Sequence, residues 1–487
     1  MQMKDEDRAF FSKARILKDK NYDGLFFFAV KTTGIFCRPS CPSPVAKEEN
    51  VEYFNSIFSA LENGYRPCNR CRPELNLEYH NSYIHGSEIV QKALKMIFDG
   101  YLNYNSIQNL ADRLFISQRQ LRKLFIDCIR LPPVKIGRYH KSIFAKKLLT
   151  NSNQPISEIA FASGFRSTRQ FNATYKEIFG ESPSKARKNR GLSSSGKTSF
   201  LLHYKEPFDF MNILSFMEPR LITGIERIED HQYSRTFRTD YARGWFSVCD
   251  SPENSALELK IISDDIRCYM EIYYRVRRMF DLDTDFTQIN TTLGKDELLA
   301  RGMRDGLVPR LPVAFEPFEF TIRAILGQQI TIKAATTLAG RIAGRTGASC
   351  DNGYPEGLDY FFPIPEELSA ASLENIGITK TRQQTIRTVT QAVTDGRLSL
   401  SVSQNFKDFR MSFSALKGIG DWTVNYVAMR GLGMKDAFPA SDLGIIKALT
   451  SSEKKPVIKE ITETARRWRP YRSYAALCLW SIPDDKV

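Results

Sequence analysis

The 487-residue sequence predicts a mixed, multidomain fold in which two small α+β domains alternate with two all-α domains. Three observations lead to this prediction: four cysteines in two close pairs near the start, two helix-turn-helix patterns in a basic stretch, and a helix-hairpin-helix pattern in the second half. At roughly 100–200 residues per domain, the length accommodates three or four domains. We expect a cysteine-rich α+β domain over residues 1–85, an all-α domain over 86–190, a linker over 191–199, a small α+β domain over 200–287 and an all-α domain over 288–487.

The first candidate site consists of Cys37 and Cys41 in a C-x3-C pattern and Cys68 and Cys71 in a C-x2-C pattern, with 26 residues between the pairs. Two close pairs supply four sulfur ligands for one tetrahedral Zn²⁺ ion. Two disulfides are the alternative. We favour zinc because the sequence opens without a secretory signal pattern and disulfides are rare in the cytosol. Neighbouring arginines give this site a basic rim suited to phosphate: Arg38, Arg66, Arg70 and Arg72.

The stretch FFFAVKTTGIFCRPSC, followed by GYRPCNRC, resembles the N-terminal domain of the Ada family of bacterial adaptive-response proteins. In that family the first cysteine of the C-x3-C pair takes a methyl group from a DNA methylphosphotriester. The resemblance implies that Cys37 is the methyl acceptor and that Cys41, Cys68 and Cys71 complete the zinc site. A zinc-bound cysteine is a thiolate, the nucleophilic form. Methylation removes one negative charge, so we expect tighter DNA binding afterwards, especially at low salt.

Charge is concentrated in the front part of the chain, which carries nearly all of the net charge of +14. Residues 101–190 hold 17 Lys and Arg against 5 Asp and Glu, a net charge of +12. Such a block favours nucleic acid as the partner, and a membrane surface is the alternative. No apolar run is long enough to span a bilayer. We therefore expect a monomeric cytoplasmic protein, associated with the nucleoid and not with a membrane.

Two helix-turn-helix patterns occupy the basic stretch. The first runs from Ser106 to Phe125, with Ser117 as the candidate N-cap of its second helix. The second runs from Ile156 to Lys176 and turns at Gly164, and a longer helix near residues 135–149 joins the two. An ordinary helical bundle with a solvated basic face is the weaker alternative.

The two units, with the ending FGESPS at residues 179–184, resemble the AraC-type DNA-binding domain, which occupies the same place in the Ada family. The resemblance implies promoter DNA and RNA polymerase as partners. The expected readout side chains are Gln118, Arg119, Arg122, Ser167, Arg169 and Gln170. The stretch from 185 to 198 lacks periodicity and predicts a flexible linker. The Pro-Cys-His-Arg active-site sequence of the O6-alkylguanine methyltransferase domain of Ada occurs nowhere, so repair of that lesion is not expected.

The α+β domain after the linker is predicted from strand-like runs at residues 233–238, 244–249 and 256–262 and a helix near 266–280. Beyond it, a helix-hairpin-helix pattern spans residues 416–426, and its glycines Gly418 and Gly420 expose backbone N–H groups to a DNA phosphate. Asp442 follows 22 residues after Gly420 at a helix start. Taken singly, the Gly-x-Gly is often only a turn and the aspartate a helix cap.

Together these segments, with RAILGQQ at 323–329 and WRPYRSY at 468–474, resemble AlkA, the 3-methyladenine DNA glycosylase II family, over about residues 200–487. The resemblance implies that Asp442 is the catalytic carboxylate, which stabilises positive charge on the sugar or orients water. It also implies an aromatic base pocket of Trp422, Tyr426, Trp480 and Phe216, suited to a cationic N-alkylated purine, although any one ring could simply be core. Gln329 occupies the position of the wedge residue, which is aliphatic in the best-known member.

The reaction subtype follows from the residue after Gly-Ile-Gly-Asp. Bifunctional relatives carry a Schiff-base lysine there, whereas this chain has Trp422, which cannot form an imine. We therefore predict a monofunctional glycosylase. Nor do we expect an iron–sulfur cluster, because a C-terminal cysteine quartet is missing and only Cys478 is present.

The resulting hypothesis is an alkylation-responsive regulator fused to a glycosylase of alkylated bases. Two rival classes stay open. One is a transcription factor whose second half is a catalytically inactive DNA-binding scaffold, against which the presence of Asp442 argues. The other is a repair enzyme whose first half only tethers it to DNA, against which Cys37 and both helix-turn-helix units argue.

Overall fold

The computed structural model of the chain describes residues 5–68, 70–73, 88–152, 154–188, 199–284, 286–450 and 456–483. The chain forms two compact units, one of residues 1–200 with 266–274 and one of residues 201–265 with 275–487. The first unit carries the four cysteines of the predicted zinc site and the helix-turn-helix elements. The second unit carries the helix-hairpin-helix.

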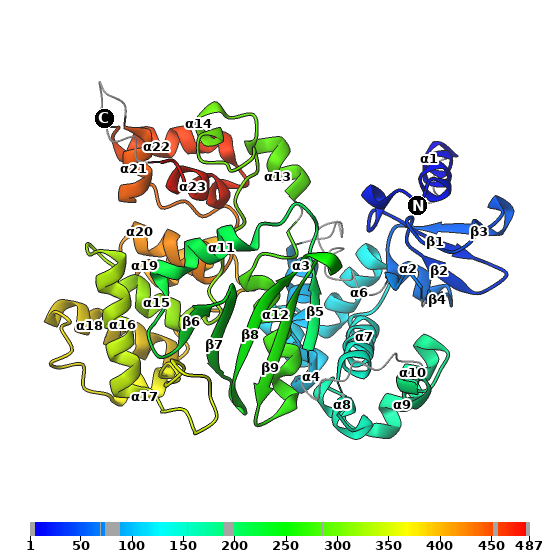
Figure 1. Ribbon diagram of the computed structural model, residues 1–487, viewed down its shortest axis with the longest axis horizontal. Helices are drawn as coiled ribbons and strands as arrows, with labels where there is room; N and C mark the ends of the chain where they lie inside the picture. Colours follow the sequence, from blue (N-terminus) through cyan, green and yellow to red (C-terminus); the bar gives the residue numbers. More distant parts are fainter. Residues whose placement is uncertain are drawn as a thin grey trace. The chain divides into compact units, whose positions relative to one another are not determined.

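A four-stranded sheet in the order β3-β1-β2-β4 carries the cysteines (Figure 1). Its strands are β1 Phe27–Val30, β2 Ile35–Cys37, β3 Val51–Phe54 and β4 Arg66–Pro67, accompanied by helices α1 Asp5–Ile16 and α2 Ile57–Glu62. Strand β1 pairs antiparallel with β2 and β3, whereas β2 pairs parallel with β4. Because Phe36 is the partner of Pro67 in that parallel pair, the next residues, Cys37 and Cys68, come close together.

Helices make up the remainder of the first unit. They are α3 Glu88–Phe98, α4 Tyr101–Tyr104, α5 Ile107–Arg113, α6 Gln118–Ile129, α7 Pro133–Asn151, α8 Ile156–Ala162, α9 Thr168–Phe179 and α10 Pro183–Lys188. Ser117 caps α6 by accepting the Gln120 backbone N–H, and Ser167 caps α9 by accepting that of Gln170. The pairs α5–α6 and α8–α9, joined through α7, therefore confirm the two predicted helix-turn-helix units.

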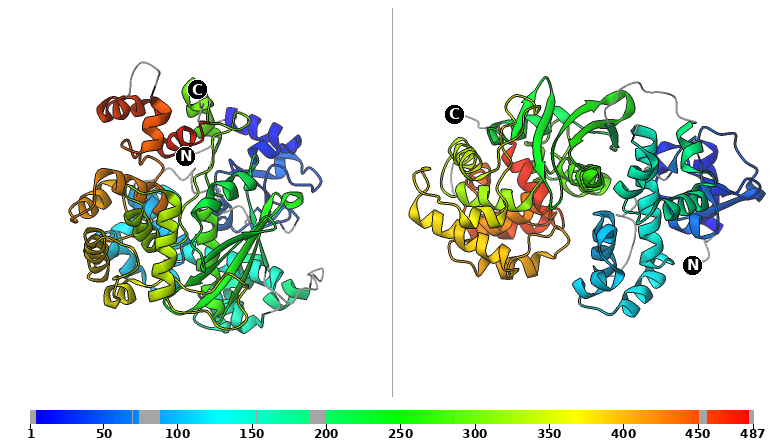
Figure 2. Two further views of the ribbon diagram at one scale, coloured as in Figure 1. Left: turned by 60° about the vertical axis from the view of Figure 1, so that its left-hand side comes forward. Right: turned by 90° about the horizontal axis from the view of Figure 1, so that it is seen from below.

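The second unit contains a five-stranded sheet in the order β5-β9-β8-β7-β6. Its strands are β5 Ser199–His203, β6 Glu226–Glu229, β7 Gln232–Arg238, β8 Arg243–Ser251 and β9 Ala256–Ser263, with helix α11 Phe210–Met217. Strand β5 and helix α12 Tyr269–Met279 cross the boundary between the units, because residues 199–200 and 269–274 belong to the first. Strands β6 to β9 pair antiparallel in succession, and the long strands lie side by side in Figure 1 and in both views of Figure 2. The three predicted strands and the predicted helix are confirmed, whereas β5 and β6 were not expected.

The rest of the second unit is helical. Its helices are α13 Phe286–Leu293, α14 Glu297–Ala300, α15 Pro317–Leu326, α16 Ile332–Thr346, α17 Pro365–Ala370, α18 Lys380–Thr394, α19 Phe406–Ser414, α20 Asp421–Tyr426, α21 Leu443–Leu449, α22 Ile458–Thr464 and α23 Arg472–Trp480. A single apolar core runs through α15, α16, α18, α20 and α23. Packing of α23 against α21 sets the distance between the two elements that carry Trp480 and Asp442.

Two details differ from the sequence-based expectation. Residues 185–188 are not part of a linker, because Pro183 begins a helix that continues to Lys188. Of the predicted linker 191–199, residues 191–198 lie outside the described residues, and Ser199 is already the first residue of β5. Within the part of the chain that the structure describes, no helix is long and apolar enough to cross a membrane.

Candidate functional site

The four predicted cysteine ligands converge in one buried cluster. The sulfur atoms of Cys37, Cys41, Cys68 and Cys71 all lie within 4.8 Å of one another, and each residue is at most 6% exposed. The Sγ atoms of Cys41 and Cys68 are 4.0 Å apart, far beyond the roughly 2.05 Å of a disulfide. Zn–S bonds of about 2.3 Å in a tetrahedron place the sulfurs about 3.8 Å apart, so the cluster fits a four-thiolate zinc site.

The four thiols are close enough to perturb one another. The hydrogen bond with Cys41 raises the pKa of Cys37, whereas the reciprocal bond with Cys37 lowers the pKa of Cys41 to about 6. Four crowded sulfurs cannot all be charged without a cation among them. Elsewhere in the described residues, no other group of three or more His, Cys, Asp and Glu side chains is arranged to hold a metal ion.

The basic rim of this cluster is uneven. Arg38 forms an ion pair with Asp23 at 3.4 Å, so its charge is partly compensated. Asp23 also accepts hydrogen bonds from the backbone and hydroxyl of Ser40, which fixes the loop between Cys37 and Cys41. The other three arginines are exposed and can meet a phosphate backbone: Arg66, Arg70 and Arg72.

The predicted readout side chains all lie on the surface at the starts of α6 and α9. Gln118, Arg119 and Arg122 are exposed on α6, and Arg169 and Gln170 are exposed on α9. Ser167 is different, because its hydroxyl accepts the backbone N–H of Gln170 and so serves as the helix cap. The arrangement leaves a row of polar and cationic groups on each second helix, as major-groove recognition requires.

The helix-hairpin-helix is formed by α19, the turn around Gly418 and α20. Gly418 has φ +89°, and a Cβ there would lie 2.1 Å from Thr385 Oγ1, so the turn requires glycine. Gly420 is exposed as the N-cap of α20, and nothing lies within 4 Å of the position that its Cβ would take. The hairpin therefore presents open backbone N–H groups at a helix start, as phosphate binding requires.

Asp442 is held by two indole N–H groups from different helices. Trp422 Nε1 on α20 donates to its Oδ2 at 2.9 Å, and Trp480 Nε1 on α23 donates to its Oδ1 at 2.8 Å. Asp442 also caps α21, since Oδ1 accepts the backbone N–H groups of Gly444 and Ile445. Four donors thus hold the half-buried carboxylate of Asp442 in one orientation.

The predicted aromatic residues surround this carboxylate. The rings of Trp422 and Tyr426 stack at 4.9 Å with an interplanar angle of 17°, and Trp480 meets Tyr426 edge-on at 6.1 Å. All three are only half-buried, unlike core rings such as Trp468, which is 1% exposed. Open aromatic faces beside a carboxylate can bind a flipped base.

Phe216, the fourth predicted pocket ring, lies between two arginines. The guanidinium of Arg220 is 3.9 Å from its centroid and that of Arg430 is 4.6 Å. Burial lowers the pKa of Arg220, and the nearby Tyr426 and Asp442 oppose this shift. Burial also lowers the pKa of Arg430 to about 10. Phe216 therefore joins the site through Arg220, and no ring contact between it and the other three is present among the described residues.

Gln329 lies in the turn between α15 and α16. Its side chain is exposed and its backbone has φ +57°, a strained conformation for a residue other than glycine. The preceding Gln328 donates to Gly418 O and to Thr423 Oγ1, each at 3.0 Å. This turn is thus fastened to the hairpin, and the side chain of Gln329 is exposed beside it.

Three residues of the candidate site were not identified from the sequence. Arg220 and Arg430 carry no motif, and only the second has a local signal, a π-helical turn at Val427–Gly431 of the kind found at functional sites. Gly444 lies in the first turn of α21 and belongs to none of the motifs used to predict the site. A Cβ at Gly444 would lie 2.9 Å from Trp480 Cδ1 and 3.1 Å from Asp442 Oδ1, so its glycine makes room for their contact.

Comparison with known protein families identifies three parts of the chain. The family model described as the metal binding domain of Ada matches residues 11–74, a helix-turn-helix domain matches residues 110–189, and the AlkA N-terminal domain matches residues 199–316. The cysteine cluster and the first of these matches together support a zinc site. These matches define the class of protein as a metal-binding, helix-turn-helix regulator joined to a DNA-repair fold.

Individual relatives agree with this class. A probable bifunctional transcriptional activator/DNA repair enzyme AlkA of Mycobacterium tuberculosis is 33% identical over 476 residues, which cover 96% of this chain and 95% of the relative. DNA-3-methyladenine glycosylase 2 of Escherichia coli is 28% identical over 58% of this chain and 96% of its own length. A 3-methyladenine DNA-glycosylase structure from Archaeoglobus fulgidus shares the fold, with a TM-score of 0.50 and 20% identity over 58% of this chain and 97% of that one.

The chain therefore belongs to the family of bifunctional transcriptional activator/DNA repair enzymes that join an Ada-type metal-binding and helix-turn-helix half to an AlkA-type glycosylase half. The predicted mixed, multidomain fold class and the two predicted resemblances are confirmed.

Proposed function

We propose that the second half of this chain is a monofunctional DNA glycosylase that excises alkylated bases of the 3-methyladenine type, with Asp442 as its catalytic carboxylate. The observation that carries the proposal is the carboxylate of Asp442 held by the indole N–H groups of Trp422 and Trp480 beside the stacked rings of Trp422 and Tyr426. A relative that covers almost the whole chain is named a DNA repair enzyme, which supports this assignment.

The geometry suits cleavage of an N-glycosidic bond. As the bond breaks, positive charge develops on the sugar, and the fixed carboxylate of Asp442 stabilises it without reorganisation. A cationic alkylated purine binds to the aromatic faces by stacking and cation–π attraction and is already a good leaving group. Because an indole and not a lysine follows the hairpin, the product is an abasic site with both DNA strands intact.

Base release from alkylated duplex DNA, compared between wild type and Asp442→Asn, tests this proposal. We expect wild type to release 3-methyladenine and the variant to release at least about 100-fold less, since a catalytic charge is lost, with DNA binding kept. A wild type that releases no base would establish the rival function, a transcription factor whose second half is an inactive scaffold. Equal release by both proteins would remove Asp442 from the mechanism.

For the first half, we propose a suicidal methylphosphotriester-DNA methyltransferase that becomes a transcriptional activator, with Cys37 as the acceptor. A single bound Zn²⁺ would be held by Cys37, Cys41, Cys68 and Cys71 and would keep these sulfurs as thiolates. The Cys37 sulfur attacks the methyl carbon, the S–CH₃ bond forms, and the methyl C–O bond breaks to leave a DNA phosphodiester. The buried sulfur cluster next to exposed Arg66, Arg70 and Arg72 supports this assignment.

Intact-mass measurement after exposure to DNA that contains methylphosphotriesters tests the acceptor. We expect a mass increase of one methyl group in wild type and none in Cys37→Ser, with peptide mapping to Cys37. Methylation located on Cys41, Cys68 or Cys71 would assign the acceptor role to that cysteine. The absence of methylation in wild type would contradict the proposal. A promoter-reporter assay with and without alkylation then separates an activator from a half that only tethers the enzyme.

The partners of the protein follow from these activities. We propose double-stranded DNA as the shared partner of both halves, with alkylated DNA and promoter DNA as its two forms and RNA polymerase as the protein partner at the promoter. Gly418, Gly420, Arg119, Arg122, Arg169 and Gln170 are the proposed DNA contacts, and each is exposed. We further propose that the protein acts as a monomer in the cytoplasm, on the nucleoid, without membrane association and without an iron–sulfur cluster.

A further inference from the structure

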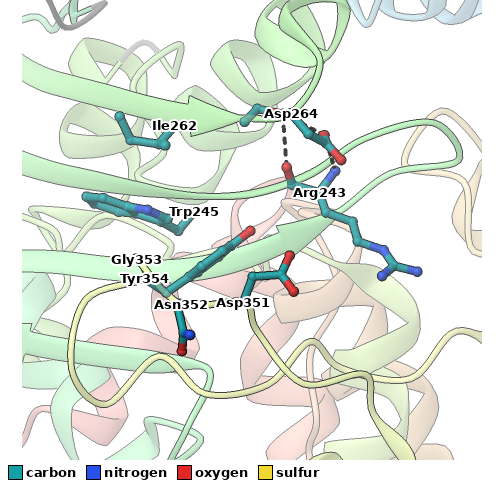
Figure 3. Close-up of a pocket in the computed structure, with 9 residues that line it drawn as sticks. Arg243, Trp245, Ile262, Asp264, Asp351, Asn352, Gly353 and Tyr354 are labelled. Carbon is teal, nitrogen blue, oxygen red and sulfur yellow. Dashed lines mark hydrogen bonds between the residues drawn. The ribbon is translucent and has the colours of Figure 1, made fainter.

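A cavity of about 440 Å³ opens in the second unit, away from the residues proposed to act on DNA (Figure 3). It lies between the adjoining ends of β8 and β9 and a loop at residues 351–354. Trp245 on β8 is paired with Ile262 on β9, so these two side chains share one face of the sheet and form one wall. Tyr354 of the loop forms another. None of the lining residues belongs to the candidate active site.

The loop is held in place by specific contacts, so the cavity is a built feature of the fold. The backbone bond from Cys350 N to Asp359 O at 2.8 Å closes the base of the loop, and Thr236 Oγ1 on β7 donates to Tyr360 O at 2.8 Å. Tyr354 meets the buried ring of Phe361 edge-on, with centroids 5.8 Å apart at 88°. These contacts fasten the loop to the sheet and fix the position of the Tyr354 ring.

Two carboxylates at the cavity have uncompensated charge. Asp351 forms no hydrogen bond or ion pair with any described residue, and Asp264 uses only Oδ1, chiefly to accept the Arg243 backbone N–H at 2.8 Å. The guanidinium of Arg243 does not pair with either acid. It stands 5.9 Å from the Phe361 centroid, and Figure 3 shows it extending away from the Trp245 and Tyr354 rings.

The acidic groups around the cavity affect the pKa of Tyr354. Burial, together with the nearby Cys350, Asp264 and Asp351, raises the pKa of Tyr354 to about 12, and Arg243 opposes this shift. In Figure 3 the Tyr354 hydroxyl points to the side on which both carboxylates lie. A negative, aromatic-walled cavity repels a DNA backbone and attracts a cation.

We propose that this cavity is a binding site for a guanidinium or alkylammonium cation, with the side chain of arginine as its best ligand. A guanidinium is planar, stacks on an indole face and forms paired hydrogen bonds with a carboxylate. Trp245 supplies the face and Asp351 the unused carboxylate. The cavity volume lies within the roughly 300–1,000 Å³ of ligand pockets. The site is independent of the proposed glycosylase and methyltransferase activities.

Titration calorimetry on the full chain tests the site, with N-acetyl-arginine amide as the probe and its citrulline counterpart as the neutral isostere. We expect binding of the arginine compound that weakens at high salt, and at least about tenfold weaker binding of the citrulline compound. A Gly-Arg-Gly peptide distinguishes the natural source of the cation. Tighter binding of the peptide than of the amide indicates a segment of a partner protein, and equal binding indicates a small molecule.

The matched variants are Asp351→Asn and Asp359→Asn, two exposed acids in the segment between Cys350 and Tyr360, of which only Asp351 lines the cavity. We expect Asp351→Asn to weaken arginine binding at least about tenfold. Asp359→Asn should bind as wild type does, and base release should be unchanged in both. Failure of wild type to bind at millimolar concentrations, equal binding of citrulline, or unchanged binding by Asp351→Asn would each overturn the proposal.

Discussion

Trp480 donates its indole N–H to Oδ1 of Asp442 at 2.8 Å, across a sequence separation of 38 residues. The same carboxylate receives the indole N–H of Trp422 on its other oxygen. Both tryptophans therefore set the direction of the carboxylate, in addition to the stacking on the base that we propose for their rings. Each tryptophan offers both a hydrogen bond and a ring surface. A substitution that removes only the indole N–H therefore tests the hydrogen bond alone.

Trp480→Phe keeps an aromatic ring and removes only the N–H donor. A hydrogen bond to a charged group contributes about 1.5–3 kcal/mol, so we expect the single-turnover rate of base release to fall at least about tenfold. The affinity for DNA that carries a stable abasic-site analogue should change little.

The control is Trp468→Phe. Trp468 also donates its indole N–H to a carboxylate, that of Asp296, at 2.7 Å, but its ring is 1% exposed in the core. We expect Trp468→Phe to lower the melting temperature and leave the rate of base release unchanged. If both variants lost activity in proportion to stability, Trp480 would be a structural residue only.

Gly444→Ala gives a second, independent test of the contact between Trp480 and Asp442. The new Cβ would lie 2.9 Å from Trp480 Cδ1, so the indole must move. Alanine is favoured over glycine in a helix by up to about 1 kcal/mol, which offsets part of the cost of moving the indole, so we expect a small change in stability together with slower base release. Gly340→Ala in α16 is the matched control, because its Cβ would meet Thr223 O at an ordinary 3.5 Å and should leave the rate unchanged. Full activity in Gly444→Ala would show that the indole position is not critical.

The sequence alone predicted the parts of both sites that are local in the chain. The cysteine pairs, the helix-hairpin-helix and the cap position of Asp442 are set by short spacings and turn residues, and the structure places them as expected. Contacts made by tertiary packing could not be predicted. Arg430 reaches Phe216 from about 210 residues further along the chain, and no local pattern in the sequence indicates that contact. The cavity beside Trp245 depends likewise on a loop about a hundred residues further along the chain.

Metal removal should affect the two halves of the protein differently. Thiolate ligands contribute binding energy to folding, so we expect a thiol-modifying reagent to release one Zn²⁺ per chain, abolish promoter binding and leave base release intact. Released metal is measured with a colorimetric chelator. Cys128→Ser is the control, because Cys128 is isolated from the cluster and its loss should leave the zinc content at one. A chain that contains no zinc, or base release that is lost together with the metal, would contradict the expectation.

Gln329 is exposed in a left-handed backbone conformation, with φ +57°, at the turn that Gln328 fastens to the hairpin. Gln329→Gly relieves that backbone strain, so we expect unchanged or slightly higher stability, by up to about 1 kcal/mol. If Gln329 fills the space left by a flipped nucleotide, the variant should release bases from duplex DNA several-fold more slowly and from single-stranded DNA at the wild-type rate. Asn375→Gly, at φ +59° on the surface of the same unit, is the matched control. Equal rates on duplex DNA for all three proteins would assign the wedge to another residue.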